Sequence, residues 1–288
     1  MGSPHRILAL LSVALCTAGC GELPASATVT GVRVVAAENS WGAVARQIGG
    51  DRASVTSIIS SPAQDPHSYE PTAADARAMA TAQLAIVNGL NYDPWAPKLL
   101  AADPVDGRVV LAVSSRLRLP AAANPHRWYD PSDVESVAGA IAGALERLDP
   151  RHAGYFAQRL RQFETSSLAR YHALIATIRR RYAGVPVGAS ESVFALLAPA
   201  LGVRLITPPG FMRATAEGAE VSAQDTASTE RQLTSGAIKV WVYNAQNVTP
   251  EIQRLNGLAR ARRIPVATVT ETLSPLGDSF AQWQVRQL

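Results

Sequence analysis

The chain has 288 residues, of which 47% are hydrophobic and 17% charged, with a formal net charge of +4 and two cysteines. This length accommodates one large domain or two of ordinary size. The basic residues are dispersed and lack the aromatic or glycine interleaving of nucleic-acid-binding segments, so we do not expect a nucleic-acid partner.

The first twenty residues are typical of a targeting segment. Arg6 supplies a positive charge, residues 7–16 form a short apolar run, and Thr17-Ala18-Gly19-Cys20 resembles a bacterial lipoprotein cleavage site. We therefore predict a signal peptide at 1–20, acylation of Cys20 and a small, polar tether at 21–31. The alternatives are an ordinary secretory signal or a membrane anchor, although about ten apolar residues are too few to span a bilayer.

From residue 32 onward, short β-branched segments alternate with helical segments, which is typical of parallel βαβ units. Strands are predicted at 32–36, 55–59, 84–87 and 109–113, and in the second half at 185–188, 203–206, 240–243 and 264–269. Helices are predicted at 41–48, 72–81, 95–100, 193–201, 228–235, 250–262 and 279–288. We therefore predict an α/β fold with two similar lobes, each a parallel sheet flanked by helices.

Between the two sets of elements lies a segment with strong helical periodicity. Apolar side chains recur every three or four residues from Phe156 to Tyr182. About thirty residues at about 1.5 Å each form a rod of roughly 45 Å, long enough to run along both lobes. We predict an N-terminal lobe at 32–149, a stiff linking helix at 150–183 and a C-terminal lobe at 184–288.

Two similar motifs each contain a histidine after a proline. They are Asp65-Pro66-His67-Ser68-Tyr69-Glu70-Pro71 and Asn124-Pro125-His126-Arg127-Trp128-Tyr129-Asp130-Pro131. The proline restricts the backbone and so fixes how the imidazole is presented. Neutral imidazole is a versatile metal ligand. Either histidine alone could be an ordinary loop residue, whereas the pair indicates a metal site.

Four candidate ligands map to one edge of the predicted sheets, because ligands of open α/β sheets bind beyond the carboxyl ends of strands. His67 follows strand 55–59, His126 follows strand 109–113, Glu191 follows strand 185–188, and Asp278 lies beyond strand 264–269. Two neutral imidazoles and two carboxylates carry a net charge of about minus two, which neutralises a divalent cation in a buried crevice.

Simpler roles exist for the two acidic residues. Glu191 could be a carboxylate at a helix start, and Asp278 could cap the last helix. His152 and His172 lie on the predicted linking helix, where we expect both to be solvated.

Taken together, these features resemble the metal-binding solute-binding lipoproteins of zinc and manganese ABC importers. The resemblance covers the chain from Val32 to the C-terminus. It rests on Cys20, the two Pro-His motifs, Asn88-Gly89-Leu90, the linking helix, Ser190-Glu191 with Phe194, and Gly277-Asp278-Ser279-Phe280.

The resemblance implies a monomeric binding protein on the extracytoplasmic face of the membrane, attached through lipid on Cys20. A divalent cation would be captured between the lobes by His67, His126, Glu191 and Asp278 and passed to an ABC permease. Zinc-specific members usually have His at the position of Glu191 and often carry a His-rich insertion before the second motif. Glu191, and the segment 114–124 without such an insertion, resemble the manganese or iron branch. We therefore favour Mn²⁺ as the bound ion, with Zn²⁺ as the next candidate.

Other classes of protein remain as alternatives. A zinc hydrolase would need an open coordination position and a general base, and the sequence contains no HExxH motif; we therefore predict no enzymatic activity. A surface-anchored adhesin or a receptor for an organic ligand would need a wide apolar pocket, which Tyr69, Trp128 and Tyr129 could line.

Overall fold

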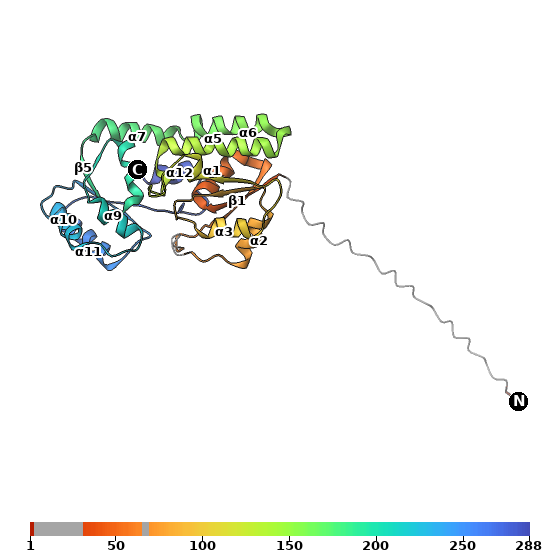
Figure 1. Ribbon diagram of the computed structural model, residues 1–288, viewed down its shortest axis with the longest axis horizontal. Coiled ribbons are helices and arrows are strands. Elements are labelled where there is room, and N and C mark those ends of the chain that lie inside the picture. Colours follow the sequence, from red (N-terminus) through yellow and green to blue (C-terminus); the bar gives the residue numbers. More distant parts are fainter. Residues whose placement is uncertain (3–30, 65–68) are drawn as a thin grey trace.

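The computed structural model describes residues 1–2, 31–64 and 69–288. Two lobes lie side by side, each built on a four-stranded parallel sheet flanked by helices (Figure 1). The strand orders are β2-β1-β3-β4 and β6-β5-β7-β8, so both sheets place the first strand of the lobe second in the sheet. The predicted fold class is confirmed.

The N-terminal lobe contains four parallel strands and the helices that connect them. β1 (Val32–Glu38) and β3 (Leu84–Val87) form the centre of the sheet, and nearly every side chain of these two strands is buried. β2 (Ala53–Ile59) and β4 (Val109–Ala112) are the edges. The connecting helices are α1 (Asn39–Gly49), α2 (Ala73–Thr81), α3 (Trp95–Ala102) and the short α4 (Val113–Arg116).

The C-terminal lobe repeats this plan with a smaller sheet. Its strands are β5 (Pro186–Ala189), β6 (Arg204–Leu205), β7 (Val240–Asn244) and β8 (Val266–Val269). Its helices are α8 (Ala198–Leu201), α9 (Pro209–Ala216), α10 (Ala223–Thr234) and α11 (Pro250–Ala261). All eight predicted strands are present in the structure, with ends that differ from the prediction by at most two residues.

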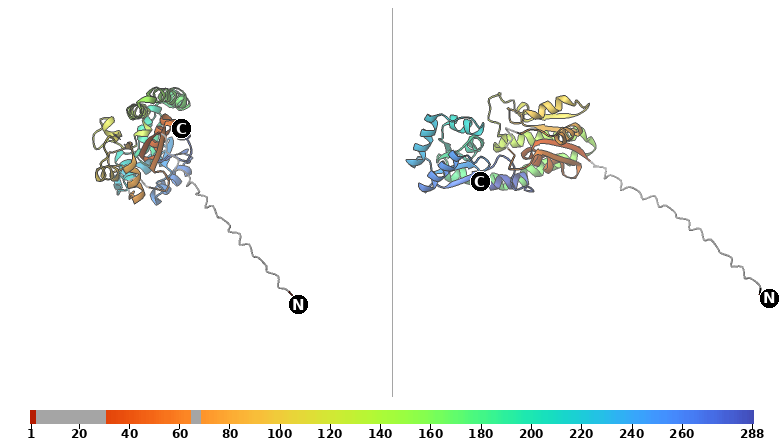
Figure 2. Two further views of the ribbon diagram at one scale, coloured as in Figure 1. Left: turned by 90° about the vertical axis from the view of Figure 1, so that its right-hand side faces the viewer. Right: turned by 90° about the horizontal axis from the view of Figure 1, so that it is seen from below.

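The predicted linking helix is two helices. α6 (Ala153–Gln162) and α7 (Ala169–Tyr182) are separated by a π-helical turn, Phe163–Ser167. Within this turn the amide of Leu168 donates to the carbonyl of Phe163 at 3.0 Å, which is the wider spacing of a π turn. A further helix, α5 (Pro131–Leu148), lies against α6 and was not predicted. Figures 1 and 2 show α5, α6 and α7 along one side of the molecule.

The last helix, α12 (Phe280–Arg286), follows the C-terminal lobe in sequence but packs on the N-terminal lobe. The backbone amide of Phe280 donates to the Gln47 side chain at 3.0 Å, and the Gln284 side chain donates to the carbonyl of Trp128 at 3.0 Å. The chain therefore passes between the lobes twice, once through α6 and α7 and once before α12.

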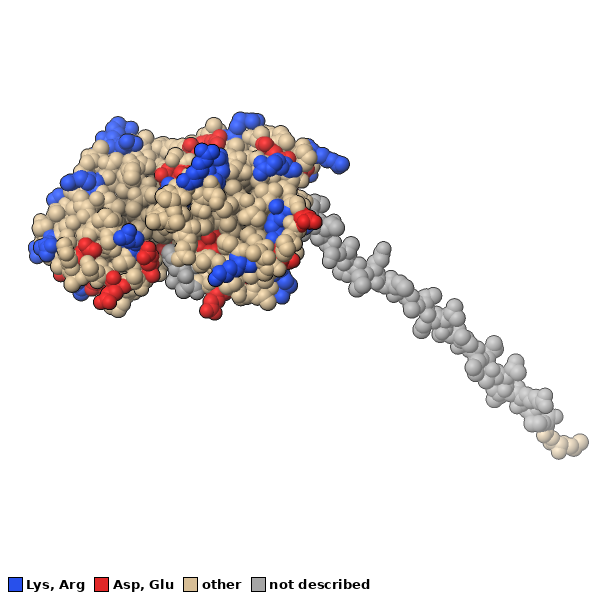
Figure 3. All heavy atoms as spheres, in the orientation of Figure 1, with Lys and Arg blue, Asp and Glu red and all other residues tan. Residues whose placement is uncertain are grey.

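The surface agrees with the dispersed charges of the sequence. On the face shown in Figure 3, Lys and Arg side chains are spread over both lobes and interspersed with acidic ones. Within the described ranges, no helix combines the length and the apolarity that crossing a membrane requires. Cys20 and His67 both lie outside the residues that the structure describes.

A buried pair of acids lies at the carboxyl end of β1. The Glu38 side chain is buried, and among the described residues no hydrogen-bond donor reaches either of its oxygens. Burial, followed by the charge of Asp93 and a hydrogen bond to it, raises the pKa of Glu38 well above its usual range. Asp93 accepts hydrogen bonds from the amides of Asn88 and Gly89, both at 2.7 Å. Glu38 is therefore the acid of the pair that keeps its proton, and Asp93 is the acceptor.

This assignment predicts how Glu38→Gln changes stability with pH. A raised pKa means that the folded protein binds more protons than the unfolded chain above the unfolded pKa of about 4.3. The stability contributed by Glu38 is therefore largest at low pH and decreases as the pH rises through its folded pKa. The glutamine side chain does not titrate, so its contribution to stability does not change with pH. Glu38→Gln should therefore increase the free energy of unfolding at pH 8, by about 1.4 kcal/mol for each unit by which the pKa of Glu38 is raised.

Urea unfolding at pH 5 and pH 8 measures the effect, and Glu220→Gln on the exposed surface is the control. The gain from Glu38→Gln should be smaller at pH 5 than at pH 8. A gain of equal size at both values would contradict a protonated Glu38.

Candidate functional site

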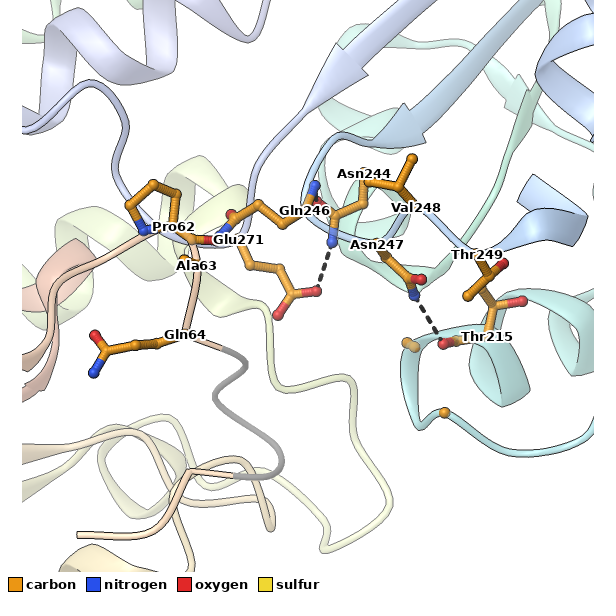
Figure 4. A pocket seen from close by; sticks show the side chains of 12 residues that line it. Pro62, Ala63, Gln64, Thr215, Asn244, Gln246, Asn247, Val248, Thr249 and Glu271 are labelled. Carbon is orange, nitrogen blue, oxygen red and sulfur yellow. Dashed lines mark hydrogen bonds between the residues drawn. The ribbon is translucent and has the colours of Figure 1, made fainter. Parts of the chain in front are cut away.

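A cavity of about 370 Å³ lies between the lobes. One wall is the N-terminal loop Pro62–Gln64, and the other is built from the C-terminal lobe, including Asn244, Asn247 and Glu271. Figure 4 shows the loop residues on one side and most of the residues of the C-terminal lobe on the other, with the Glu271 side chain between them. The wall residues follow the carboxyl ends of β2, β7 and β8, which is where open α/β sheets bind their ligands.

His126 is fully buried at the interface between the lobes. The side-chain oxygen of Asn124 lies 2.8 Å from His126 Nδ1 and also accepts from the His126 amide at 3.0 Å. The Asn124 nitrogen donates to the carbonyl of Ser192 in the other lobe at 2.7 Å. In this orientation of the Asn124 side-chain amide, its oxygen can only accept a hydrogen bond. Neutral His126 therefore carries its proton on Nδ1 and presents Nε2 as an acceptor. That is the tautomer that a metal ion at Nε2 requires.

Glu271 comes two residues after β8 and faces His126 from the other lobe. Its Oε2 lies 3.7 Å from His126 Nε2, and only 8% of its side chain is exposed. The Asn244 side chain donates to the other oxygen, Oε1, at 2.7 Å (Figure 4). Two ligand atoms that each lie about 2.1 Å from one ion can be up to about 4.2 Å apart. The spacing of these two atoms therefore suits ligands of a single ion.

Glu191 is also buried, two residues after β5 and beside Ser192, whose carbonyl accepts from Asn124. The Asn247 side chain donates to Glu191 Oε2 at 3.1 Å. Burial raises the pKa of the nearby Tyr129 well above its usual range, the hydrogen bond to Thr270 lowers it, and the charges of Tyr171, Glu271 and Glu191 raise it further.

Asp278 does not belong to this group. It forms an ion pair with Arg286, in which Arg286 Nε donates to Asp278 Oδ2 at 2.6 Å. By that point the chain has left β8 and is entering α12, whose N-cap is Ser279. The acid that the structure places beside His126 is Glu271, which the sequence analysis missed. The sequence feature that could have identified Glu271 is its distance from the last strand. Glu271 lies two residues past the end of this strand, whereas Asp278 lies nine residues past it.

The structure places only some of the other predicted site residues at the interface between the lobes. The structure brings His126 and Glu191 to the interface between the lobes, and His67 belongs to residues 65–68, outside the described part of the chain. Within the described part, no three His, Cys, Asp or Glu side chains are clustered closely enough to hold a metal ion. His152 and His172 are partly exposed and pair with Asp149 and Glu135 on the helical side of the molecule.

Comparison with known proteins identifies the family. Residues 34–288 match the family model described as zinc-uptake complex component A, periplasmic (ZnuA). The chain belongs to this family. The resemblance inferred from the sequence motifs is thereby confirmed, and the family consists of extracytoplasmic solute-binding proteins rather than enzymes.

Relatives of this ZnuA-family chain carry names that refer to different metals. The manganese-binding lipoprotein MntA of Halalkalibacterium halodurans is 32% identical over 146 residues, 49% of this chain, and the chain spans about half, 48%, of its length. The iron-binding protein YfeA of Yersinia pestis is 29% identical over 271 residues, 90% of this chain and 75% of YfeA.

Solved structures share the fold. FpvC from Pseudomonas aeruginosa, in complex with Mn²⁺, has a TM-score of 0.71 at 21% identity, covering 89% of this chain and 95% of FpvC. At this identity the likeness concerns the arrangement of the two lobes.

The hydrogen bonds of Asn124 predict a stability effect. Asn124→Ala removes the acceptor of the buried His126 ring and amide and a bond between the lobes, so the free energy of unfolding should fall by about 1–3 kcal/mol. Urea unfolding measures the change, with Gln158→Ala on the exposed side of α6 as the control. If both variants unfold like the wild-type protein, Asn124 does not fix the His126 loop.

Proposed function

We propose that this protein captures a divalent transition metal ion between its two lobes and delivers it to the permease of an ABC importer. The observation that carries the proposal is the 3.7 Å approach of His126 Nε2 to Glu271 Oε2 across the interface between the lobes. The imidazole comes from one lobe and the carboxylate from the other, so an ion bound by both would hold the lobes together.

The proposed ligands are His67, His126, Glu191 and Glu271, with Glu271 in place of Asp278. Two neutral imidazoles and two carboxylates give a net charge of about minus two, which a divalent cation neutralises. A buried carboxylate without a counter-charge is costly. A divalent cation bound by both acids would lower the cost of burying them.

The donor set is compatible with Mn²⁺ and with Zn²⁺. Carboxylate oxygens suit manganese, whereas imidazole nitrogen suits zinc, and a given site of this kind binds Zn²⁺ more tightly than Mn²⁺. The presence of a glutamate rather than a histidine at position 191 favours Mn²⁺ as the bound ion. Competition titration of the purified protein with the two ions decides between them.

Release requires that the ligands of one lobe move away from the ion. Docking of the permease on the two lobes could separate them, and protonation of imidazole below about pH 6 would compete with the ion for nitrogen. We propose that the protein works on the extracytoplasmic face of the membrane as a monomer, attached through a lipid on Cys20.

The assignment of Glu271 leads to a matched pair of variants. Glu271→Gln should weaken binding of the preferred ion at least about tenfold, because an amide is a poorer ligand than a carboxylate and leaves the site with less negative charge. Asp278→Asn should leave the dissociation constant within about twofold, because Asp278 is paired with Arg286. Isothermal titration calorimetry measures both, and a loss caused by Asp278→Asn alone would restore Asp278 as the ligand.

The two motif histidines lead to a second set of variants. His67→Ala and His126→Ala should each weaken metal binding at least about tenfold, since each removes one ligand of the ion. His172→Ala is the control, because His172 is partly exposed and pairs with Glu135 away from the cavity. Equal losses in all three variants would contradict ligation by the motif histidines.

A further inference from the structure

A tight turn after β3 reaches toward the proposed metal site. In this turn, Leu90 and Asn91 have positive φ angles of 57° and 58°, a conformation that residues other than glycine seldom adopt. The Asp93 carboxylate holds the turn by accepting from the amides of Asn88 and Gly89. Strained backbone of this kind persists where the surrounding structure fixes it, and it occurs often at functional sites.

The turn positions Tyr92, whose side chain is 1% exposed. Its hydroxyl donates to Glu271 Oε2 in the other lobe at 3.0 Å. Its ring packs edge-on against the rings of His126 and Trp128, with centroid distances of 5.5 and 5.2 Å. Tyr92 therefore contacts both the imidazole and the carboxylate that approach each other across the interface.

Hydrogen bonds from both lobes fix the Glu271 carboxylate. Tyr92 of the N-terminal lobe donates to Oε2, and Asn244 of the C-terminal lobe donates to Oε1. Asn244 is itself held in place, because its amide donates to Ser190 Oγ at 3.2 Å and its side-chain oxygen accepts from the Gln246 amide at 3.0 Å. Rotation of the carboxylate would therefore break a hydrogen bond at each oxygen.

We propose that Tyr92 is a positioning residue that restricts Glu271 to ligation through the single oxygen Oε2, and that it thereby sets the preference among metal ions. This inference rests on the proposed function. A carboxylate oxygen has two lone pairs, so Oε2 can accept from Tyr92 and bind an ion at the same time. Ligation through both oxygens would require the carboxylate to turn, which Tyr92 and Asn244 oppose.

The number of oxygens that Glu271 offers affects the choice of metal. Zn²⁺ favours four ligands in a tetrahedron, whereas Mn²⁺ favours six ligands that are mostly oxygen. Ligation through Oε2 alone means that Glu271 supplies one ligand atom rather than two, which suits four-coordinate Zn²⁺ better than six-coordinate Mn²⁺. The Tyr92 hydroxyl therefore shifts the preference of the site toward Zn²⁺ relative to Mn²⁺.

Tyr92→Phe tests the proposal, because it keeps the ring that packs on His126 and Trp128 and removes only the hydroxyl. Competition titrations of the full chain should show Zn²⁺ binding weakened at least about tenfold, which is typical when a hydrogen bond to a ligand is lost. Mn²⁺ binding should weaken less. The absorption of bound Co²⁺ should lose intensity, because four-coordinate Co²⁺ absorbs more strongly than Co²⁺ with five or six ligands.

Tyr129→Phe is the matched control. Tyr129 is a buried tyrosine of the same lobe, and its hydroxyl also crosses the interface, donating to the carbonyl of Thr270 at 2.8 Å rather than to a carboxylate. This variant should change the affinities for Zn²⁺ and Mn²⁺ by the same factor and leave the Co²⁺ spectrum unchanged.

The outcomes separate the inference from the function on which it rests. The inference is overturned if Tyr92→Phe keeps the wild-type ratio of affinities and the wild-type Co²⁺ spectrum. It is also overturned if Tyr129→Phe shifts both in the same way, since the cause would then be a loosened interface. If the wild-type chain binds none of the three ions, the proposed function itself fails.

Discussion

The structure depends on how two buried carboxylates are accommodated between the lobes. Glu191 and Glu271 are both buried, and burying ionised groups is unfavourable unless they are paired and hydrogen-bonded. The amides of Asn247 and Asn244 provide part of this compensation from within the C-terminal lobe. The N-terminal lobe adds Tyr92 and the His126 ring. Closure of the lobes therefore surrounds these acids with groups from both lobes.

Most of the fold could be predicted because the sequence encodes it locally. Short β-branched runs, each bounded by turn residues, are typical of buried parallel strands, and all eight occur where the pattern indicated. α5 was missed although Asp130 caps it and Pro131 occupies its first turn. Its many Ala and Gly residues weaken the apolar periodicity, and Asp130-Pro131 also belongs to the second Pro-His motif. The π turn in the linking segment was not predicted, because the periodic series was continued through Ser167, whereas the buried side chains are Phe163, Leu168 and Tyr171, which are five and three residues apart.

The candidate site was predicted only in part. His126 and Glu191 follow strand ends, so their place at the interface could be inferred from the order of elements. Choosing between Glu271 and Asp278 required knowledge of where the chain turns away from the sheet. Residues just beyond β8 remain at its carboxyl edge, whereas Asp278 belongs to the passage toward α12. The contact of Tyr92 with Glu271 joins residues 179 positions apart, and only the tertiary arrangement of the lobes creates it.

The two passages of the chain between the lobes limit how the molecule can deform. One passage is the pair of helices α6 and α7, and the other is the extended segment that leads to α12, anchored on the N-terminal lobe through Phe280 and Gln284. A single tether would let one lobe swing in any direction. With two connections, the rotation that meets the least resistance is the one about the line that joins them. Such a rotation would change the separation of His126 and Glu271, which approach each other from opposite lobes.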